Sequence, residues 1–281
     1  MEGNGYAKPV LVGTGWLAER LGDDGIVVAE VDENPDLYEE GHIPGAAKLH
    51  WKLDLQDPVE RDIVDREAFE RVLGLRGIGN DTTVVVYGDK NNWFAAYAYW
   101  YLKVYGHRDV RILDGGRQKW IDEGRELTTD APKPRPVDYR AAERDESIRA
   151  YRSQVQEWLG EPGHALVDVR SPAEYSGELI APPGYEQEGA QRAGHIPTAV
   201  SIPWASAVRD DGTFKPAAEL KELYAGQGVT PDKRVTAYCR IGERSAHTWF
   251  VLTELLGFEQ VRNYDGSWTE WGNLVDVPIE R

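Results

Sequence analysis

The sequence contains the same set of motifs twice, and this repeat restricts the fold more than any other feature. The tetrapeptide Gly-His-Ile-Pro begins at Gly41 and again at Gly194, 153 positions later. A second motif, Val-Arg-x-x-Asp-Gly, places its aspartate at Asp114 and again at Asp265, 151 positions later. The nearly equal spacing indicates two copies of one domain, because tandem copies keep the order and separation of their motifs.

Each copy alternates short apolar segments with helix-like segments. This alternation is typical of an α/β fold in which a mostly parallel sheet is flanked by helices. In the first copy we expect strands at residues 26–30, 46–53, 83–87 and 110–113, and a helix at 93–104. In the second copy we expect strands at residues 165–169, 199–203, 235–238 and 260–263, and a helix at 246–256.

A proline-rich segment separates the two copies. Prolines occupy the alternate positions 132, 134 and 136, which favours a stiff, extended linker. We therefore predict a first domain at residues 1–128, a linker at 129–146 and a second domain at 147–281.

Composition and charge exclude several classes of function. The net charge of −16 argues against a nucleic-acid partner, which needs a basic face. No apolar run approaches the roughly 20 residues that span a membrane, and the first residues do not resemble a signal peptide, so we expect a cytoplasmic protein. The chain has a single cysteine, and its histidines do not have the spacing of metal ligands. We therefore expect no metal site and no cofactor.

The only cysteine, Cys239, follows the apolar segment 235–238 and opens a short loop before a helix. In such a layout the loop amides and the positive end of the helix stabilise an anion, here a thiolate or a persulfide. Arg240 and Arg244 add positive charge, and a setting of this kind can lower a thiol pKa to roughly 3.5–7.5. We predict Cys239 as the nucleophile, Arg240 and Arg244 as substrate-binding residues, and the rest of the active-site loop as Ile241, Gly242, Glu243 and Ser245.

The first copy provides an internal control for this interpretation. At an offset of 151, Gly88 corresponds to Cys239 and Asp89 to Arg240, so the first copy lacks the reactive residues. A lone cysteine is often only a small buried apolar residue, but that interpretation leaves the two arginines unexplained. His42 and His195 occur in both copies, which favours a structural role for them.

Taken together, these motifs resemble those of the two-domain rhodanese family of sulfurtransferases over nearly the full length. The resemblance rests on the paired Gly-His-Ile-Pro, the segments Asp-Val-Arg-Ser-Pro-Ala-Glu-Tyr from Asp168 and Cys-Arg-Ile-Gly-Glu-Arg from Cys239, and Tyr-Asp-Gly-Ser-Trp-Thr-Glu-Trp from Tyr264. It implies an inactive first domain and a catalytic second domain. It also implies transfer of the outer sulfur of thiosulfate through a Cys239 persulfide to cyanide, a thiol or a protein acceptor, with release of sulfite.

Three alternatives stay open at this stage. Family members that use 3-mercaptopyruvate tend to carry glycine after the cysteine, so Arg240 favours thiosulfate. A related phosphatase would carry arginine six positions after the cysteine, whereas this chain has Arg244 at the fifth. A non-catalytic binding module is the third alternative. Ile241 and Glu174 depart from the animal thiosulfate enzymes, so substrate contacts from these positions are not carried over.

Two further features of the second copy enter the prediction. Asp168 and Arg170 are possible supporting residues, although a structural ion pair of Arg170 with Asp168 or Glu174 explains the arginine at least as well. The segment 180–189 has no counterpart in the first copy. Since such loops are often functional, we expect it at the rim of the active-site crevice, where it would admit or exclude sulfur acceptors.

Overall fold

The computed structural model describes residues 4–281, and the chain divides into two compact units. The first comprises Pro9–Asp145 together with Val208–Phe214. The second comprises Glu146–Ala207 and Lys215–Arg281, and it also includes residues 4–8 from the start of the chain. Within residues 4–281, no helix combines the length and the apolar character needed to cross a membrane.

The first unit contains a five-stranded sheet in the order β1-β5-β4-β2-β3, and all of its strand pairs are parallel. Parallel strands need crossover connections, which the helices between them provide. The strands are β1 (Leu11–Val12), β2 (Ile26–Glu30), β3 (Ala47–Lys48), β4 (Thr83–Tyr87) and β5 (Val110–Leu113). The helices are α1 (Thr14–Ala18), α2 (Leu37–Glu40), α3 (Arg66–Leu75), η1 (Lys90–Asn92), α4 (Trp93–Val104) and α5 (Gly116–Asp122).

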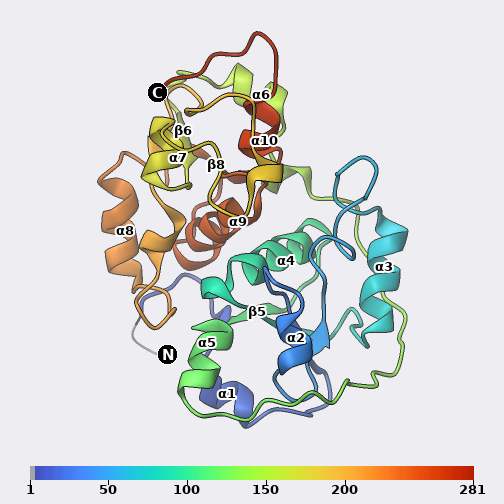
Figure 1. Cartoon of the computed structure of the whole chain (residues 1–281). Coiled ribbons are helices and arrows are strands. Elements are labelled where there is room, and N and C mark those ends of the chain that lie inside the picture. The colour runs from blue at the N-terminus through green and yellow to red at the C-terminus, as the bar shows by residue number, and fades with distance from the viewer. Residues whose placement is uncertain (1–3) are drawn as a thin grey trace. The chain divides into compact units, whose positions relative to one another are not determined.

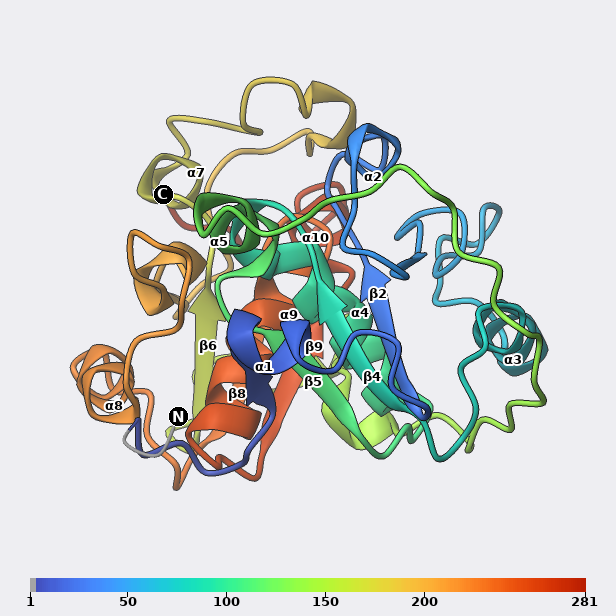
Figure 2. The same ribbon diagram turned by 90° about the horizontal axis from the view of Figure 1, so that it is seen from below.

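Helices cover both faces of this sheet. Figure 1 shows α4 on one side of β5 and the pair α1 and α5 on the other, and Figure 2 shows α4 behind the strands β2, β4 and β5. The core on the α1 and α5 side includes Leu17, Ile43 and Trp120, which pack with Val28 and Val85. Because the central strands are buried on both faces, β4 is apolar throughout its interior rather than alternating.

The second unit repeats this arrangement with four parallel strands in the order β7-β6-β8-β9. Its strands are β6 (His164–Asp168), β7 (Val200–Ser201), β8 (Arg234–Tyr238) and β9 (Val261–Tyr264). Its α-helices are α6 (Arg152–Glu157), α7 (Pro172–Ser176), α8 (Ala217–Ala225), α9 (Glu243–Phe250) and α10 (Ser267–Trp271). Shorter helical segments are η2 (Glu146–Ile148), η3 (Glu186–Glu188), η4 (Trp204–Ala207) and η5 (Val251–Leu255).

The two units share their hydrogen bonding as well as their topology, which confirms the predicted repeat of an α/β domain. Tyr87 and Tyr238 end the central strands β4 and β8, and each hydroxyl accepts a hydrogen bond from the Ile amide of Gly-His-Ile-Pro, at 2.9 and 3.1 Å. His42 and His195 are buried, and each ring stacks on a tyrosine. Both histidines are therefore structural, as the repeat indicated.

The helix after Cys239 begins earlier than the sequence pattern predicted. It starts at Glu243 rather than at residue 246, and it continues after Phe250 into a π-helical turn, Val251–Leu255. Gly242 precedes it with a φ of 99°, a conformation that favours glycine. The negative charge of Glu243 is favourable in the first turn of a helix. Glu243, Arg244 and Ser245 thus belong to the helix, and only residues 239–242 form the loop.

The proline-rich segment lies along the first unit. No regular element is found in its described residues 129–145, and several of its backbone groups hydrogen-bond to that unit. The amide of Val137 donates to the carbonyl of Gly74 at 3.0 Å, and the amide of Ala142 donates to the carbonyl of Tyr105 at 3.1 Å. The domain boundaries at residues 128 and 147 stay predictions.

Candidate active site

Cys239 is the first residue after the central strand β8, at the carboxyl end of a parallel sheet. Its backbone is fixed on both sides by the start of α10. The Cys239 amide donates to the hydroxyl of Ser267 at 3.1 Å, and its carbonyl accepts from the amide of Trp268 at 3.1 Å. The Ser267 hydroxyl in turn donates to the carbonyl of Tyr264 at 2.7 Å. The nucleophile predicted from the sequence therefore has a rigid backbone.

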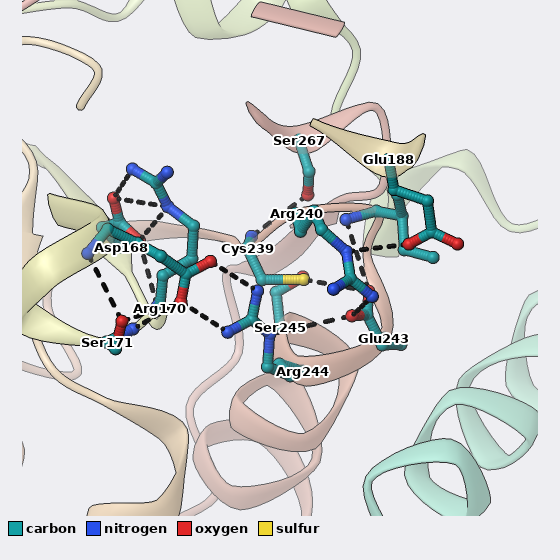
Figure 3. A network of polar contacts seen from close by, with 12 residues as sticks. Asp168, Arg170, Ser171, Glu188, Cys239, Arg240, Glu243, Arg244, Ser245 and Ser267 are labelled. Atoms are coloured by element: carbon teal, nitrogen blue, oxygen red, sulfur yellow. Dashed lines mark hydrogen bonds and ion pairs between the residues drawn. The ribbon is translucent and has the colours of Figure 1, made fainter. Parts of the chain in front are cut away.

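The sulfur of Cys239 lies in the tight turn formed by residues 239–242 and the start of α9. The amide of Gly242 donates to Sγ at 3.2 Å, and the hydroxyl oxygen of Ser245 lies 3.6 Å from it. Figure 3 shows this sulfur with Glu243 and the guanidinium of Arg240 beside it. The site thus brings together the cysteine and the charged residues that the sequence placed around it.

Glu243 is in direct contact with the thiol. Its Oε2 accepts a hydrogen bond from Sγ at 3.2 Å and another from the amide of Ile241 at 3.3 Å. Its Oε1 lies 3.3 Å from a guanidinium nitrogen of Arg240 and 3.7 Å from Nε of Arg244. The carboxylate is fully buried, and because it accepts the Ile241 amide it occupies part of the amide cradle expected to hold the sulfur anion.

Arg244 is held by a carboxylate from α7. Two of its guanidinium nitrogens donate to the two oxygens of Glu174, at 2.9 and 3.1 Å. Glu174 also closes a capping box at the start of α7, where its Oε2 accepts from the amide of Ser171 at 3.0 Å. Burial raises the pKa of Glu174, but the hydrogen bonds and charge of Arg244 outweigh this and hold it at about 2.

Arg240 is held by the segment that the first copy lacks. Its Nε lies 2.8 Å from Oε2 of Glu188, and its guanidinium lies 4.2 Å from the centre of the Tyr185 ring. A guanidinium over an aromatic face is a favourable cation–π contact. The 180–189 segment therefore lies next to the cysteine loop. Its expected influence on sulfur acceptors stays a prediction.

The expected lowering of the Cys239 thiol pKa is wrong in this arrangement of side chains, which raises that pKa instead. Burial raises the pKa of Cys239 above its ordinary value, and the charge of Glu243 raises it further. Arg244 and the hydrogen bonds of Ser245 lower it, but they do not outweigh burial and Glu243. The arginines and the helix end alone would lower this pKa, but the buried Glu243 carboxylate lies between them and opposes their effect.

Asp168 and Arg170 form the structural ion pair that the sequence left as an alternative. A guanidinium nitrogen of Arg170 lies 2.6 Å from Oδ2 of Asp168 and donates to the carbonyl of Gly194 at 2.7 Å. The Arg170 guanidinium also lies 4.6 Å from the centre of the Trp268 ring. Both charged side chains are buried, and each is neutralised by the other in this ion pair.

Two further side chains fix the start of α9 from β9 and from the helix itself. The hydroxyl of Ser245 donates to Oδ1 of Asn263 at 2.6 Å, and Nδ2 of Asn263 donates to the carbonyl of Gly242 at 3.0 Å.

His247 is buried, and desolvation lowers its pKa to about 3, so it is neutral at neutral pH. With its pKa lowered to about 3, His247 is a weak proton acceptor.

The corresponding loop of the first unit has no room for a side chain where the second has its cysteine. A Cβ added to Gly88 would lie 2.1 Å from the carbonyl oxygen of Val31. The neighbouring Asp89 donates its amide to Asp32, and burial raises the pKa of Asp89 to about 6 and that of Asp32 to about 9. This loop is therefore acidic and lacks a nucleophile.

Besides Glu243, four residues make contacts in the site that were not predicted from the sequence. Glu174 was noted only as a departure from a family pattern, although Ser171 and Glu174 have the spacing of a capping box and could have been placed at a helix start. Glu188 and Tyr185 lie in a segment with no periodic pattern. Asn263 was expected only as the end of a strand.

The geometry agrees with what comparisons with known proteins show. A family model described as a rhodanese-like domain matches residues 14–123 and 152–274. The chain belongs to the rhodanese-like family. The structure supplies both of its domains, and the second one contains the cysteine.

Named relatives extend the family assignment. A protein of Saccharopolyspora erythraea, provisionally named a thiosulfate sulfurtransferase, is 59% identical over 97% of this chain and 96% of its own length. The sulfur carrier protein TtuD of Thermus thermophilus is 59% identical over 99% of both chains. A solved structure of EanB with a cysteine persulfide and ergothioneine has a TM-score of 0.84 at 27% identity, covering 96% of this chain and 70% of that one.

Proposed function

We propose that this protein is a sulfurtransferase that moves the outer sulfur of thiosulfate through a persulfide on Cys239 to cyanide or a thiol. The observation that carries the proposal is the position of the Cys239 sulfur, which accepts the Gly242 amide at 3.2 Å and lies beside the Glu243 carboxylate that Arg240 and Arg244 contact. The names of its relatives, which include a thiosulfate sulfurtransferase and a sulfur carrier, support the same chemistry.

The reaction takes place in two displacement steps. In the first, Sγ attacks the outer sulfur of thiosulfate, the sulfur–sulfur bond of the donor breaks, and its electron pair leaves with sulfite. In the second, the acceptor attacks the outer sulfur of the persulfide and the Cys239 sulfur leaves. Covalent catalysis of this kind gives ping-pong kinetics. Backbone amides such as that of Gly242 stabilise the charged sulfur as an oxyanion hole stabilises oxygen.

Arg240 and Arg244 are the proposed binding residues for the doubly anionic donor. Guanidinium groups bind oxyanions through charge-assisted hydrogen bonds. Both now pair with carboxylates, Arg240 with Glu188 and Arg244 with Glu174. The donor would have to compete with these partners, and Glu188 yields more readily because its side chain is 22% exposed while that of Glu174 is 1% exposed.

A second candidate shares the persulfide and differs in the acceptor. The 59% identity to a sulfur carrier protein over nearly the whole of both chains favours delivery of the sulfur to another protein. Transfer from 3-mercaptopyruvate is the other alternative for the donor. We also propose the cytoplasm as the site of action, where a reducing environment keeps a lone thiol free.

Turnover with matched donors tests the proposal. We expect thiocyanate formation from thiosulfate and cyanide, a lower kcat/KM with 3-mercaptopyruvate, and no hydrolysis of a phenyl phosphate ester. Loss of all turnover in Cys239→Ser is the control. A preference for 3-mercaptopyruvate would overturn the donor assignment, and phosphate release would favour the phosphatase alternative.

A further inference from the structure

Glu243 has a place in the site that the two displacement steps do not explain. It is a fully buried carboxylate, and a buried carboxylate is costly unless other groups compensate its charge. Its Oε1 faces Arg240 and Arg244, whereas its Oε2 accepts hydrogen bonds from the thiol and from the amide of Ile241. One oxygen is therefore neutralised by arginine and the other is directed at the reacting sulfur.

The thiol needs a proton acceptor because its surroundings keep it protonated. Burial and the charge of Glu243 both disfavour a resting thiolate on Cys239. The nucleophile must then lose its proton during the attack rather than before it. Among the described residues, Glu243 is the carboxylate in hydrogen-bond contact with Sγ, at 3.2 Å, a distance suited to proton transfer.

We propose that Glu243 is the general base of sulfur transfer: it takes the proton of Cys239 as the new sulfur–sulfur bond forms and passes it to the departing sulfite. This inference rests on the proposed function. The step is balanced: the thiol and thiosulfate dianion give an anionic persulfide and hydrogen sulfite. The S–H bond and the donor S–S bond break, while an S–S bond and an O–H or S–H bond of hydrogen sulfite form. No oxidant or reductant is required.

Proton transfer also releases the arginines at the moment they are needed. Once Glu243 is neutral, its Oε1 competes less for Arg240 and Arg244, so more of their charge is available to the departing sulfite and to the anionic persulfide. Other charged groups packed around the pair are already compensated: Glu174 on α7 by Arg244, Glu188 in the inserted segment by Arg240, and Asp265 before α10 by Arg149. His247 on α9 is neutral at neutral pH.

The test is the pH dependence of persulfide formation in a single turnover with thiosulfate, followed by intact mass. For Glu243→Gln we expect a rate at pH 7 about 100-fold below the native rate, the lower end of what a general base contributes. The variant's rate should rise with pH as the thiol ionises, while the native rate changes little through neutral pH. Glu188→Gln is the matched control: it removes a carboxylate from the same arginine without touching the sulfur, so the native shape of the profile should be kept.

The fraction of Cys239 present as thiolate distinguishes a Glu243 that acts as a base from a Glu243 whose charge only disfavours the thiolate. Removing the Glu243 charge should increase the fraction of Cys239 that is ionised at a given pH, which the ultraviolet absorbance of the thiolate measures. A variant with more thiolate but slower transfer supports a base. A Glu243→Gln protein that transfers sulfur faster than the native protein at pH 7 would show that Glu243 only opposes the thiolate, and would overturn the proposal.

A second variant makes the test independent of the loss of a buried charge. Glu243→Asp keeps the charge beside the arginines but draws the carboxylate away from Sγ, so we expect it to reproduce the slow, pH-dependent transfer. A native pH profile in this variant contradicts the proposal. Failure of the proposed function looks different, because the native protein itself would then gain no sulfur from thiosulfate or from 3-mercaptopyruvate.

Discussion

At the scale of single residues, the site is a chain of charges in which each arginine is shared between carboxylates. Arg244 lies between Glu174 and Glu243, and Arg240 lies between Glu188 and Glu243. Both arginines are buried, so the carboxylates determine how much positive charge the sulfur experiences. Counting the arginines in the sequence therefore overestimates how far they lower the pKa of the Cys239 thiol.

The Glu174–Arg244 pair should contribute to stability in a pH-dependent way. The pKa of Glu174 is about 2 in the folded protein and near 4.5 when unperturbed. A depressed pKa stabilises the fold above the unfolded value, and this contribution is lost as pH falls from about 4.5 toward 2. We predict that Glu174→Gln lowers the free energy of unfolding at pH 7 by about 3 kcal/mol, and by less at pH 3.

Denaturant unfolding at the two pH values measures this effect. Glu178→Gln is the control, because it removes a carboxylate from the exposed end of the same region. An equal loss for Glu174→Gln at pH 7 and pH 3 would contradict the assigned ion pair.

The residue scale also shows what the sequence could reveal. Cys239 was identifiable because it is the only cysteine and because its counterpart is Gly88. The contact of Glu243 with the Cys239 sulfur was not identifiable, because the sequence pattern placed Glu243 in a loop, whereas the structure makes it the first residue of α9. A shift of three residues at the helix start decides whether this carboxylate can turn back toward the sulfur.

At the scale of elements, the repeated strand, turn and helix were predictable and the inserted segment was not. The strands β2, β4 and β5 and the helix α4 match the predicted ranges. Apolar segments with clear ends are the segments whose secondary structure a sequence pattern predicts best. The strands β3 and β7 are only two residues long, because most of the extended segments predicted there lie outside the sheet. The 180–189 segment has neither periodicity nor a second copy to guide its placement.

Within that segment, Glu188 should compete with the anionic donor for Arg240. We predict that Glu188→Gln lowers the KM for thiosulfate by up to about fivefold, since a partly exposed ion pair is worth up to about 1 kcal/mol. Initial rates against thiosulfate concentration measure this. Glu186→Gln is the matched control, because Glu186 lies in the same turn η3 and is exposed. A higher KM for Glu188→Gln would mean that the segment orients Arg240 rather than competing for it.

In the first unit, the turn after β4 depends on the absence of a side chain at Gly88. We predict that Gly88→Ala lowers the free energy of unfolding by about 1–3 kcal/mol, because the added Cβ would lie 2.1 Å from the Val31 carbonyl. Gly79→Ala is the control, since its nearest neighbour would be at an ordinary 3.7 Å. Equal stability of the two variants, measured by thermal unfolding, would contradict the close approach.

At the scale of the whole molecule, the two units have the same architecture and different chemistry. The central turn of the first unit carries buried carboxylates with raised pKa values, whereas that of the second carries the cysteine and its arginines. The parallel α/β character of both units followed from the alternation of strands and helices, whereas the order of the strands was not predicted. The difference in chemistry followed from comparing the two copies position by position.

The buried His247 should make the protein sensitive to mild acid. Its pKa is about 3 in the fold against an ordinary 6.5, so the unfolded chain binds a proton that the folded one does not. Stability is then fully present above about pH 6.5 and falls as pH decreases toward 3. We predict that this group alone lowers the free energy of unfolding by about 2 kcal/mol between pH 7 and pH 5, and that His247→Gln reduces the slope. An unchanged slope in the unfolding data would contradict it.

Intact mass spectrometry shows whether Cys239 carries the transferred sulfur. The native protein and Cys239→Ser are each incubated with thiosulfate and then with cyanide. We expect the native protein alone to gain one sulfur atom and to lose it to cyanide as thiocyanate forms. A native protein whose mass is unchanged by thiosulfate and by 3-mercaptopyruvate would show that Cys239 is not a sulfur carrier.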